Sequence, residues 1–275
     1  MNKFEVYNKI YNFYRMFETW KLKNHEYYQY CCKKVKKHNH ILHILTNGPS
    51  LNDTINYIDE VGGDVMMMNQ MYLTPYYTKY RPKYMCFWDD DVYLNNEQLE
   101  EEVKNLNSND DDMIIIFTEH MFKKYHTKYP KLNMKWIYTG GATRPYCKMK
   151  DKKKYEENYS SPATYTVALA ALYAGIQMGY EKIYLHGNDF SFICNYSVDE
   201  NNQVYMTNQH AYESEAKKVP MNITMKEAME AAYYSMVGYD NIAKYAEDEG
   251  VKIYNLSIHS YIDVFEKLRM DLKEK

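Results

Sequence analysis

The chain has 275 residues and a formal net charge of -3, with 34 Lys and Arg residues against 37 Asp and Glu residues. This near balance argues against nucleic acid as the main partner, because nucleic-acid-binding domains carry a basic excess. The five cysteines have no regular spacing, which predicts neither a disulfide framework nor a zinc site and favours a reducing, cytoplasmic compartment. No stretch approaches the roughly 20 apolar residues that a membrane span needs.

The first 38 residues carry the pattern of a basic amphipathic helix. Aromatic and apolar side chains recur every three or four residues from Phe4 to Trp20, which predicts one apolar stripe on a helix within residues 3–37. Lysines lie between and after these positions and outnumber the acidic residues. Two interpretations are open. The helix packs on its own domain or on a second subunit of a homo-oligomer, or it makes peripheral contact with an anionic membrane at its inner face.

Residues 39–275 are expected to form one Rossmann-like domain in which apolar strands alternate with helices. This alternation predicts a doubly wound, mainly parallel α/β sheet. The first half is expected to contain, in chain order, strand Ile41–Leu45, helix Asn52–Val61, strand Asp64–Met68, strand Lys83–Trp88, helix Glu97–Leu106 and strand Met113–Thr118.

The second half is less regular at its start. In residues 119–160, the charge run Lys148–Glu157 predicts a solvated loop or flap. Residues 191–222 are polar and poorly periodic, which is typical of a substrate lid. Thr224 and Glu227 predict a capping box at the start of a long helix. The expected elements are helix Ser161–Met178, strand Lys182–His186, helix Thr224–Glu249, strand Val251–Leu256 and helix Ser260–Leu268.

A polar turn follows the first strand, with the sequence Asn47-Gly48-Pro49-Ser50. A strand that ends in such a turn and continues as a helix places backbone N–H groups and small side chains at the carboxyl edge of the sheet, where open α/β sheets bind ligands. Asn47 as an amide donor, Gly48 for close approach and Ser50 near a helix N-terminus suit a phosphate or a ribose. The turn lacks the lysine of a Walker loop and the glycines of a dinucleotide fold, which argues against adenine nucleotides and NAD.

Other predicted strands end in polar residues as well. Asn69 and Gln70 follow the second strand, Asp89 follows the third, and Gly187 and Asp189 follow the fifth. The carboxyl ends of parallel strands lie at one edge of a sheet, so these residues and the first turn are expected to surround a single cleft. The Asp189 carboxylate could accept a hydrogen bond from a ribose, from a sugar hydroxyl or from a backbone N–H as a structural cap.

Acidic residues and two histidines are candidates for the chemistry of this cleft. The run Asp89-Asp90-Asp91 is either a solvated turn or an acidic clamp, in which Asp89 and Asp91 would hold Mg²⁺ or Mn²⁺ against a nucleoside diphosphate. His210 lies in a polar stretch where an imidazole could act as a general base near neutral pH. His259, after the last strand, lies at the same edge and is the competing candidate.

Family-like blocks occur at NGPSL (47–51), MNQMY (68–72) and GYEKIYLHGNDF (179–190), with a less specific one at VKIYNL (251–256). Together they resemble the bacterial lipooligosaccharide sialyltransferases of glycosyltransferase family 42. NGPSL also occurs in motility-associated flagellar glycosyltransferases and in related pterin pyrophosphokinases, which are the second choice. The Asn-Gln-x-Tyr block favours the sialyltransferases.

The resemblance implies a Rossmann-like domain of GT-A type with a lid. It also implies inverting transfer of a sialic-acid-like sugar from a CMP-sugar donor to a glycan acceptor, without a metal cofactor. The pathway would be the biosynthesis of a bacterial surface glycan, lipopolysaccharide or capsule.

By position, the resemblance places Asn47, Gly48 and Ser50 in the donor nucleotide pocket, Asn69 in contact with the nucleotide and Asp189 beside it. Tyrosines after the Gly-x-Asp turn hold the donor phosphate in that family. The candidates for this role are Tyr196 and, further on, Tyr205.

Two positions depart from the family pattern. Asp89 stands where the family has an asparagine, and a carboxylate there would repel a donor phosphate unless it were protonated or bound to a metal. The family's catalytic histidine falls near Tyr234, so His210 could supply the base only from the lid. Two alternatives therefore stay open: a metal-dependent transferase with a nucleoside-diphosphate-sugar donor, and an ATP-dependent pterin pyrophosphokinase.

Overall fold

The structure is a computed structural model that describes residues 26–32, 40–90, 99–101, 103–105, 112–137, 143–158, 160–208, 210–211 and 214–269. Most of the amphipathic helix expected within residues 3–37 lies outside these ranges. Asp91 lies outside them as well.

Eight parallel strands form the central sheet, in the order β11-β10-β6-β1-β2-β3-β4-β5. In chain order, the sheet begins with β1, and β2 to β5 are added on one side of it. The chain then returns to the other side of β1, where β6 pairs with it. The strand order therefore reverses between β1 and β6, which makes this pair the topological switch point of the sheet. The bounds are β1 (Ile41–Leu45), β2 (Asp64–Met68), β3 (Tyr84–Cys86), β4 (Ile114–Thr118), β5 (Met134–Ile137), β6 (Lys182–His186), β10 (Lys252–Asn255) and β11 (Glu266–Lys267).

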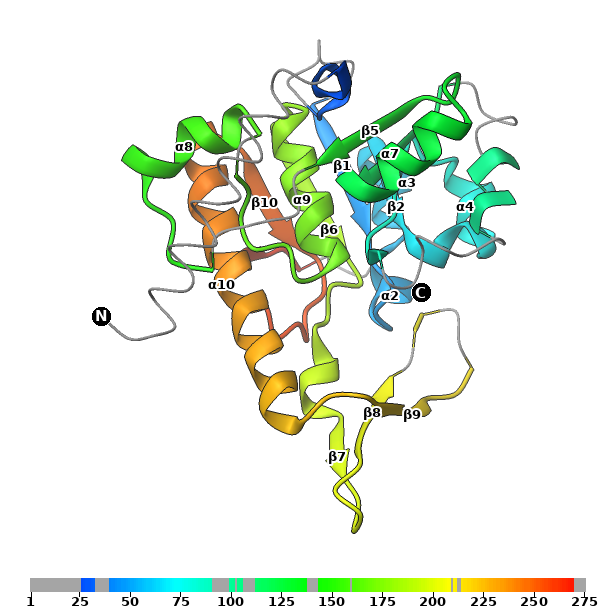
Figure 1. The fold of residues 1–275 in the computed structure, drawn as a ribbon, viewed down its shortest axis with the longest axis vertical. Helices are drawn as coiled ribbons and strands as arrows, with labels where there is room; N and C mark the ends of the chain where they lie inside the picture. The colour runs from blue at the N-terminus through cyan, green and yellow to red at the C-terminus, as the bar shows by residue number, and fades with distance from the viewer. Residues whose placement is uncertain are drawn as a thin grey trace.

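All six predicted strands are formed, and the expected doubly wound, mainly parallel sheet is confirmed. Each strand of this kind is apolar on both faces because helices cover both sides. In β1, Leu42 and Ile44 belong to the core beneath α9 (Val167–Gln177), whereas Leu45 belongs to the core beneath α7 (Glu119–Lys128). Figure 1 shows these helices with the sheet and with α10 (Met225–Glu249), which has the predicted capping box of Thr224 and Glu227 and ends at Gly250.

Several local predictions are wrong. The expected helix Asn52–Val61 is divided into α2 (Leu51–Thr54) and α3 (Tyr57–Val61), and the expected closing helix Ser260–Leu268 is replaced by turns and the short strand β11. The sequence patterns also missed α4 (Pro75–Tyr80), α7 and β5. Of the expected helix Glu97–Leu106, residues 99–101 and 103–105 are described and are helical.

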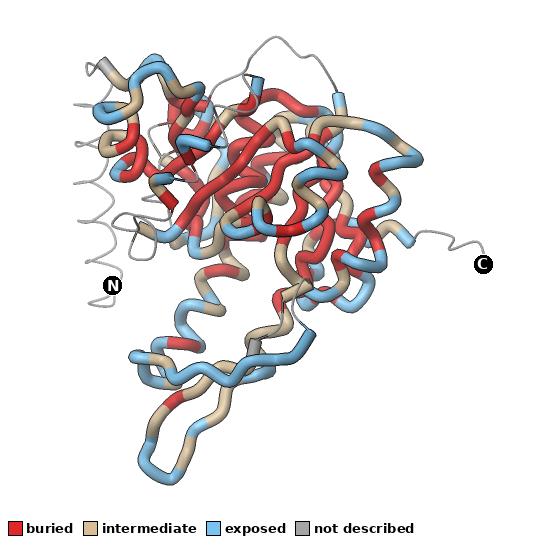
Figure 2. Tube along the Cα trace, turned by 90° about the vertical axis from the view of Figure 1, so that its right-hand side faces the viewer, coloured by how far each residue is buried: buried red, intermediate tan, exposed pale blue. Residues whose placement is uncertain are grey.

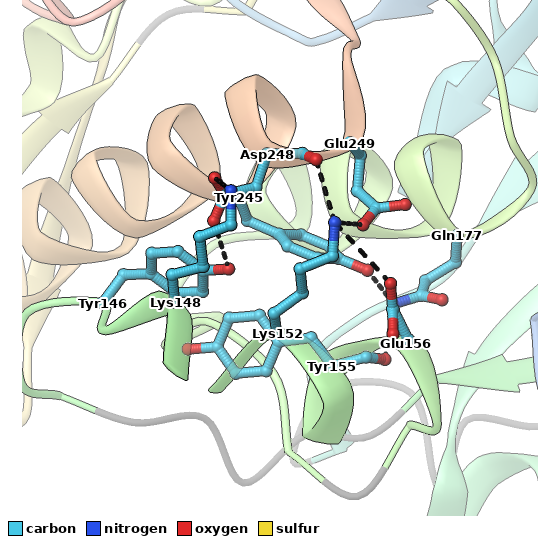
Figure 3. A network of polar contacts seen from close by, with 9 residues as sticks. All are labelled: Tyr146, Lys148, Lys152, Tyr155, Glu156, Gln177, Tyr245, Asp248 and Glu249. Atoms are coloured by element: carbon cyan, nitrogen blue, oxygen red, sulfur yellow. Dashed lines mark hydrogen bonds and ion pairs between the residues drawn. The ribbon is translucent and has the colours of Figure 1, made fainter. Parts of the chain in front are cut away.

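The charge run at 148–157 is a docked helix, α8 (Lys148–Glu156), and the predicted solvated flap is wrong. Figure 3 shows two of its lysines directed at the last turn of α10, with Lys148 Nζ 2.6 Å from Asp248 Oδ1 and Lys152 Nζ 2.8 Å from Glu249 Oε1. Tyr155 on the inner face of α8 is fully buried against Tyr245 of α10. The acidic partners lie far away in the sequence, so the charge run alone did not reveal the helix.

Residues 191–222 form a small projection from the main sheet, and we call its antiparallel strands β7, β8 and β9 the lid sheet (Figures 1 and 2). Figure 2 shows that most of this segment is exposed or half-buried. Its elements are the 3-10 helix η3 (Ser191–Cys194), β7 (Tyr196–Val198), β8 (Val204–Asn208) and β9 (Lys217–Met221).

The described end of the N-terminal segment packs on β5. It contains the 3-10 helix η1 (Glu26–Tyr30), and Trp136 Nε1 donates to the carbonyl oxygen of Tyr27 at 2.9 Å. Cys31 pairs with Trp136 as an isolated parallel bridge and is 2% exposed. Among the helices of the described residues, none has both the length and the apolar character to cross a membrane.

Two buried histidines join β1 to β6 beneath the first turn. His43 Nε2 lies 3.1 Å from the carbonyl oxygen of Gly62, which can only accept, so this nitrogen carries the proton. In the neutral ring, His43 Nδ1 then accepts from His186 Nε2 at 2.9 Å, and His186 Nδ1 accepts from the Thr54 hydroxyl at 3.2 Å. Burial lowers the pKa of His43, and burial together with His43 lowers the pKa of His186 well below its usual value. A second proton on His43, at Nδ1, would set two N–H donors against each other.

We expect the stability to fall as the pH drops below about 6.5, the pKa of an unfolded-state histidine. The unfolded chain takes up protons there, whereas the folded histidines with their lowered pKa stay neutral, so each contributes a loss of up to about 1.4 kcal/mol per pH unit. Urea unfolding between pH 7.5 and pH 5 measures this. His43→Gln should flatten the slope, the exposed His259→Gln should leave it unchanged, and equal slopes in all three proteins would contradict the prediction.

Candidate active site

The turns after β1 and β6 lock together at the switch point. The Thr46 N–H donates to the carbonyl oxygen of His186 at 2.9 Å, and the Gly48 N–H donates to that of Gly187 at 3.0 Å. A Cβ at Gly48 would lie 2.2 Å from the Gly187 carbonyl oxygen, so only glycine allows this approach. Gly187 has a φ of 68°, the left-handed region that glycine adopts without strain.

Asp189 holds the first turn from the other side. Its carboxylate accepts the Ser50 N–H at 2.9 Å and the Ser50 hydroxyl, and Ser50 Oγ also lies 2.8 Å from Ser257 Oγ after β10. Asp189 is only 8% exposed, and both of its oxygens bind the first turn. Of the three acceptor roles foreseen for this carboxylate, the structure therefore has the backbone N–H, and Asp189 positions the turn.

A cavity of about 210 Å³ opens beside these two turns. Its walls come from the β1 turn, the β6 turn, the first residues of α9, the start of the lid sheet and Tyr239 of α10. The lining residues are Thr46, Asn47, Gly48, Pro49, Met68, Thr166, Val167, Ala168, Gly187, Asn188, Asp189, Phe190, Ser191, Phe192, His210 and Tyr239.

Two buried amide atoms in this cavity have no hydrogen-bond partner among the described residues, Asn47 Oδ1 and Asn188 Nδ2. The Tyr239 hydroxyl donates to Asn188 Oδ1 at 3.1 Å, and Nδ2 of the same amide has no partner among the described residues. Buried polar atoms in folded proteins are nearly always paired, because an unpaired one costs about 1–3 kcal/mol. Asn47 and Asn188 therefore bring one unpaired acceptor and one unpaired donor to the wall of this cavity.

The N-terminus of α9 also lines the cavity. Thr166 is the N-cap, and its side chain accepts from the Leu169 N–H at 3.3 Å. The first N–H groups of a helix have no partner within the helix, and the helix dipole favours negative charge there. This helix has 11 residues, whereas α2 has four and its N-terminal Ser50 already binds the Asp189 carboxylate. An anion in this cavity is therefore best stabilised on the α9 side.

His210 is the predicted base, and it lies in the cavity wall. The next residue ties its segment to the first turn, because the Ala211 N–H donates to the carbonyl oxygen of Asn47 at 2.8 Å. Asn52 Nδ2 donates to the Ala211 carbonyl oxygen at 3.0 Å. These two bonds hold the segment that carries His210 next to the Asn47 turn, although the two are far apart in the sequence.

Several predicted site residues lie outside this cavity wall. Asn69 Oδ1 accepts from the Trp88 N–H at 3.2 Å, and Gln70 and Asp89 are exposed at the same sheet edge. The expected single cleft around all four strand ends thus takes in only the ends of β1 and β6, with Met68 from β2.

The tyrosine candidates and the second histidine also lie outside the wall. Tyr196 of β7 packs edge-on against Phe192, and the Tyr205 hydroxyl donates to Asp199 Oδ2 at 3.3 Å while Lys218 Nζ lies 4.5 Å from its ring centroid. His259 is exposed after β10.

In the run Asp89-Asp90-Asp91, the middle carboxylate is committed to protein groups. Asp90 accepts from the Thr118 hydroxyl and lies 2.8 Å from His120 Nδ1. Asp89 is exposed with a φ of 94°, and Asp91 lies outside the described residues. Within the described ranges, no three His, Cys, Asp or Glu side chains are grouped so that they could hold a metal ion.

Strained residues mark the carboxyl edge of the sheet. Asn69 after β2, Asp89 after β3 and Phe190 after β6 have φ values of 48°, 94° and 55°. Positive φ is costly for a side chain as bulky as phenylalanine, and such strain gathers at functional sites. The Phe190 ring packs edge-on against Phe192 at 4.6 Å between centroids, and both rings line the cavity.

The fold is shared with solved sialyltransferases. Sialyltransferase Cst-II in complex with a trisaccharide acceptor and CMP is 19% identical to this chain, with a TM-score of 0.50 over 86% of this chain and 88% of that chain. The monofunctional α-2,3-sialyltransferase Cst-I from Campylobacter jejuni is 20% identical, with a TM-score of 0.51 over 88% of this chain and 84% of that chain. A Maf glycosyltransferase from Magnetospirillum magneticum AMB-1 has 12% identity and a TM-score of 0.49, over 88% of this chain and 36% of its own.

No protein-family model matches the sequence, and no curated protein matches it. At identities of 19% and 20%, the two sialyltransferase structures bear on the fold. The fold that the resemblance implied is confirmed.

Replacing Gly48 by alanine tests the contact between the two turns. The new Cβ would overlap the Gly187 carbonyl oxygen, and overpacking against backbone should lower the free energy of unfolding by about 3 kcal/mol. Gly250→Ala is the matched control, because its φ is 70° but nothing lies within 4 Å of the added Cβ, so it should cost only about 1 kcal/mol. Urea unfolding of both variants checks this, and equal losses would refute the close contact.

Proposed function

We propose that this protein is a glycosyltransferase that transfers a sialic-acid-like sugar from a CMP-activated donor to a glycan acceptor with inversion. The observation that carries the proposal is the content of one cavity at the switch point: an unpaired amide acceptor and donor, a helix N-terminus and an imidazole. The fold shared with Cst-I and Cst-II supports it, and Cst-II was solved with CMP and a trisaccharide acceptor.

The nucleoside fits the unpaired polar atoms. Asn47 Oδ1 would accept a hydrogen bond and Asn188 Nδ2 would donate one, to the hydroxyls of the ribose or the edge of the base. The volume of about 210 Å³ lies below the roughly 300–1,000 Å³ of most ligand pockets. The cavity would therefore hold the nucleoside part, and the donor sugar would extend toward the lid sheet and His210.

The chemistry is a single displacement at the anomeric carbon. His210 takes the proton of the acceptor hydroxyl, the acceptor oxygen bonds to the anomeric carbon, and the bond from that carbon to the phosphate oxygen breaks. CMP leaves with the electron pair, and the N-terminus of α9 stabilises the charge on its phosphate. Attack from the face opposite the leaving group inverts the configuration.

The setting of the reaction belongs to the same proposal. The acceptor would be a bacterial surface glycan of the lipopolysaccharide or capsule type, extended in the cytoplasm. Residues 1–38 would give peripheral contact with an anionic membrane or with a second subunit of a homo-oligomer.

We expect CMP at 100 times its Kd to raise the melting temperature by about 5–10 °C, because ligand binding to the native state adds about 2.7 kcal/mol. Asn188→Asp keeps the acceptor for Tyr239 and removes the donor, so it should weaken CMP binding about tenfold. Asn255→Asp is the matched control, because Asn255 Nδ2 is also buried without a partner among the described residues but lies outside the cavity wall.

The comparison ligands are CDP, UDP, GDP and ATP, each with and without Mg²⁺ or Mn²⁺. A larger shift with one of them than with CMP would overturn the proposal. A metal-dependent shift with a diphosphate would then point to the clamp of Asp89 and Asp91.

Replacing His210 by alanine should lower turnover by about 10²–10⁴-fold if it is the general base. The shift in melting temperature caused by CMP should stay close to that of the wild type, because the nucleoside contacts remain. CMP release from CMP-sialic acid in the presence of a glycan acceptor measures the turnover. His259→Ala is the control and should keep the turnover of the wild type. Wild-type turnover in His210→Ala together with a loss in His259→Ala would make His259 the general base instead.

A further inference from the structure

Tyr165, which precedes α9, forms a cluster with three side chains of the N-terminal half of α10, and we call Tyr165, Met229, Tyr233 and Tyr234 the aromatic platform. The rings of Tyr165 and Tyr234 are stacked, with centroids 5.5 Å apart and an interplanar angle of 21°. Tyr233 meets Tyr234 edge-on at 5.4 Å. Met229 precedes Tyr233 by one turn of the helix, so their side chains are neighbours on its surface.

The platform faces solvent. Tyr165 is 49% exposed, Tyr233 63% and Met229 42%. Figure 2 shows that this half of α10 is mostly exposed or half-buried as it runs from the main sheet to the lid sheet. Contiguous exposed apolar side chains usually mark a binding surface.

The size of the platform favours a small ligand over a second subunit. A tyrosine side chain can bury roughly 150–250 Å², so the exposed parts of the platform add up to roughly 300 Å². A stable protein interface needs about 800 Å² from each partner. Stacked rings of this extent match the flat face of one or two sugar rings.

The platform lies near the proposed donor cavity along the chain. Tyr165 directly precedes Thr166, Val167 and Ala168, which line the cavity. On α10, Tyr233 precedes the cavity residue Tyr239 by six residues, a rise of about 9 Å along the helix. An oligosaccharide whose reacting end enters the cavity can therefore reach the platform with its next residues.

An ion pair and the capping carboxylate of Glu227 lie next to the platform. Lys226 and Glu230 lie one turn apart on the same half of α10, with Nζ and Oε1 3.7 Å apart. No charged side chain belongs to the platform itself, so the surface suits an uncharged ligand. A neutral hexopyranose has such a surface, because the C–H groups on one face of its ring can lie against an aromatic face.

We propose that the aromatic platform is the acceptor subsite, where a neutral hexopyranose of the glycan acceptor stacks on Tyr165 and Tyr233. This inference rests on the proposed glycosyltransferase function and names the part of the substrate that this surface recognises. The tyrosine rings provide the contact, so phenylalanine serves in their place and alanine does not.

The test uses lactose, maltose and chitobiose as probes, in saturation-transfer NMR with the full-length protein. The wild type is expected to bind at least one of them, and Tyr165→Ala and Tyr233→Ala should weaken that binding about fivefold to tenfold. Tyr165→Phe and Tyr233→Phe should bind like the wild type. Leu73→Ala, which removes an exposed apolar side chain elsewhere, should have no effect.

A second readout separates the subsite from the proposed function. The shift in melting temperature caused by CMP should be the same in wild type and alanine variants, because the platform lies outside the donor cavity. Failure of the wild type to bind CMP counts against the proposed function. Normal CMP binding, with no probe bound by the wild type or with equal sugar binding in all variants, overturns the subsite. So does self-association of the wild type that Tyr233→Ala abolishes without a change in sugar binding.

Discussion

The bond between Asp189 and Ser50 is the constraint on which the site depends. It joins the turns after β1 and β6, the two strands between which the sheet order reverses. Because both carboxylate oxygens face Ser50, the two turns cannot separate without leaving a nearly buried charge unpaired, which is costly. Gly48 and Gly187 permit this close approach, and both turns line the cavity.

The sheet could be predicted because its information is local. Each of the six predicted strands is a short apolar run that ends in a polar residue or a glycine, and α10 has both a capping box and a glycine stop in its sequence. The same local logic placed Asn47, Gly48, Gly187 and Asp189 at one edge, because parallel strands end together. These residues do line the cavity.

The elements that the sequence did not reveal depend on partners distant in the chain. From the sequence alone, Lys148 and Lys152 were predicted to be solvated. In the structure, α10 places Asp248 and Glu249 beside them. The sequence did not predict that Thr166–Ala168 line the cavity, although Thr166 is a good N-cap residue. The hydrophobic periodicity of a helix does not show whether its N-terminus faces the switch point. Asn69 and Asp89 lie at the same sheet edge as the cavity but do not line it. The sequence could not show this, because the order of the strands predicts which strand ends are neighbours but not where each side chain points.

The use of Asp189 as an internal cap also sets how a donor could lie. A carboxylate at the start of α2 repels a phosphate and occupies the N–H group that would bind one, so that helix N-terminus is closed to an anionic ligand. The N-terminus of α9 also lines the cavity and carries no carboxylate cap. For the donor proposed above, the uncharged nucleoside then belongs near Asn47 and Asn188 and the phosphate near Thr166.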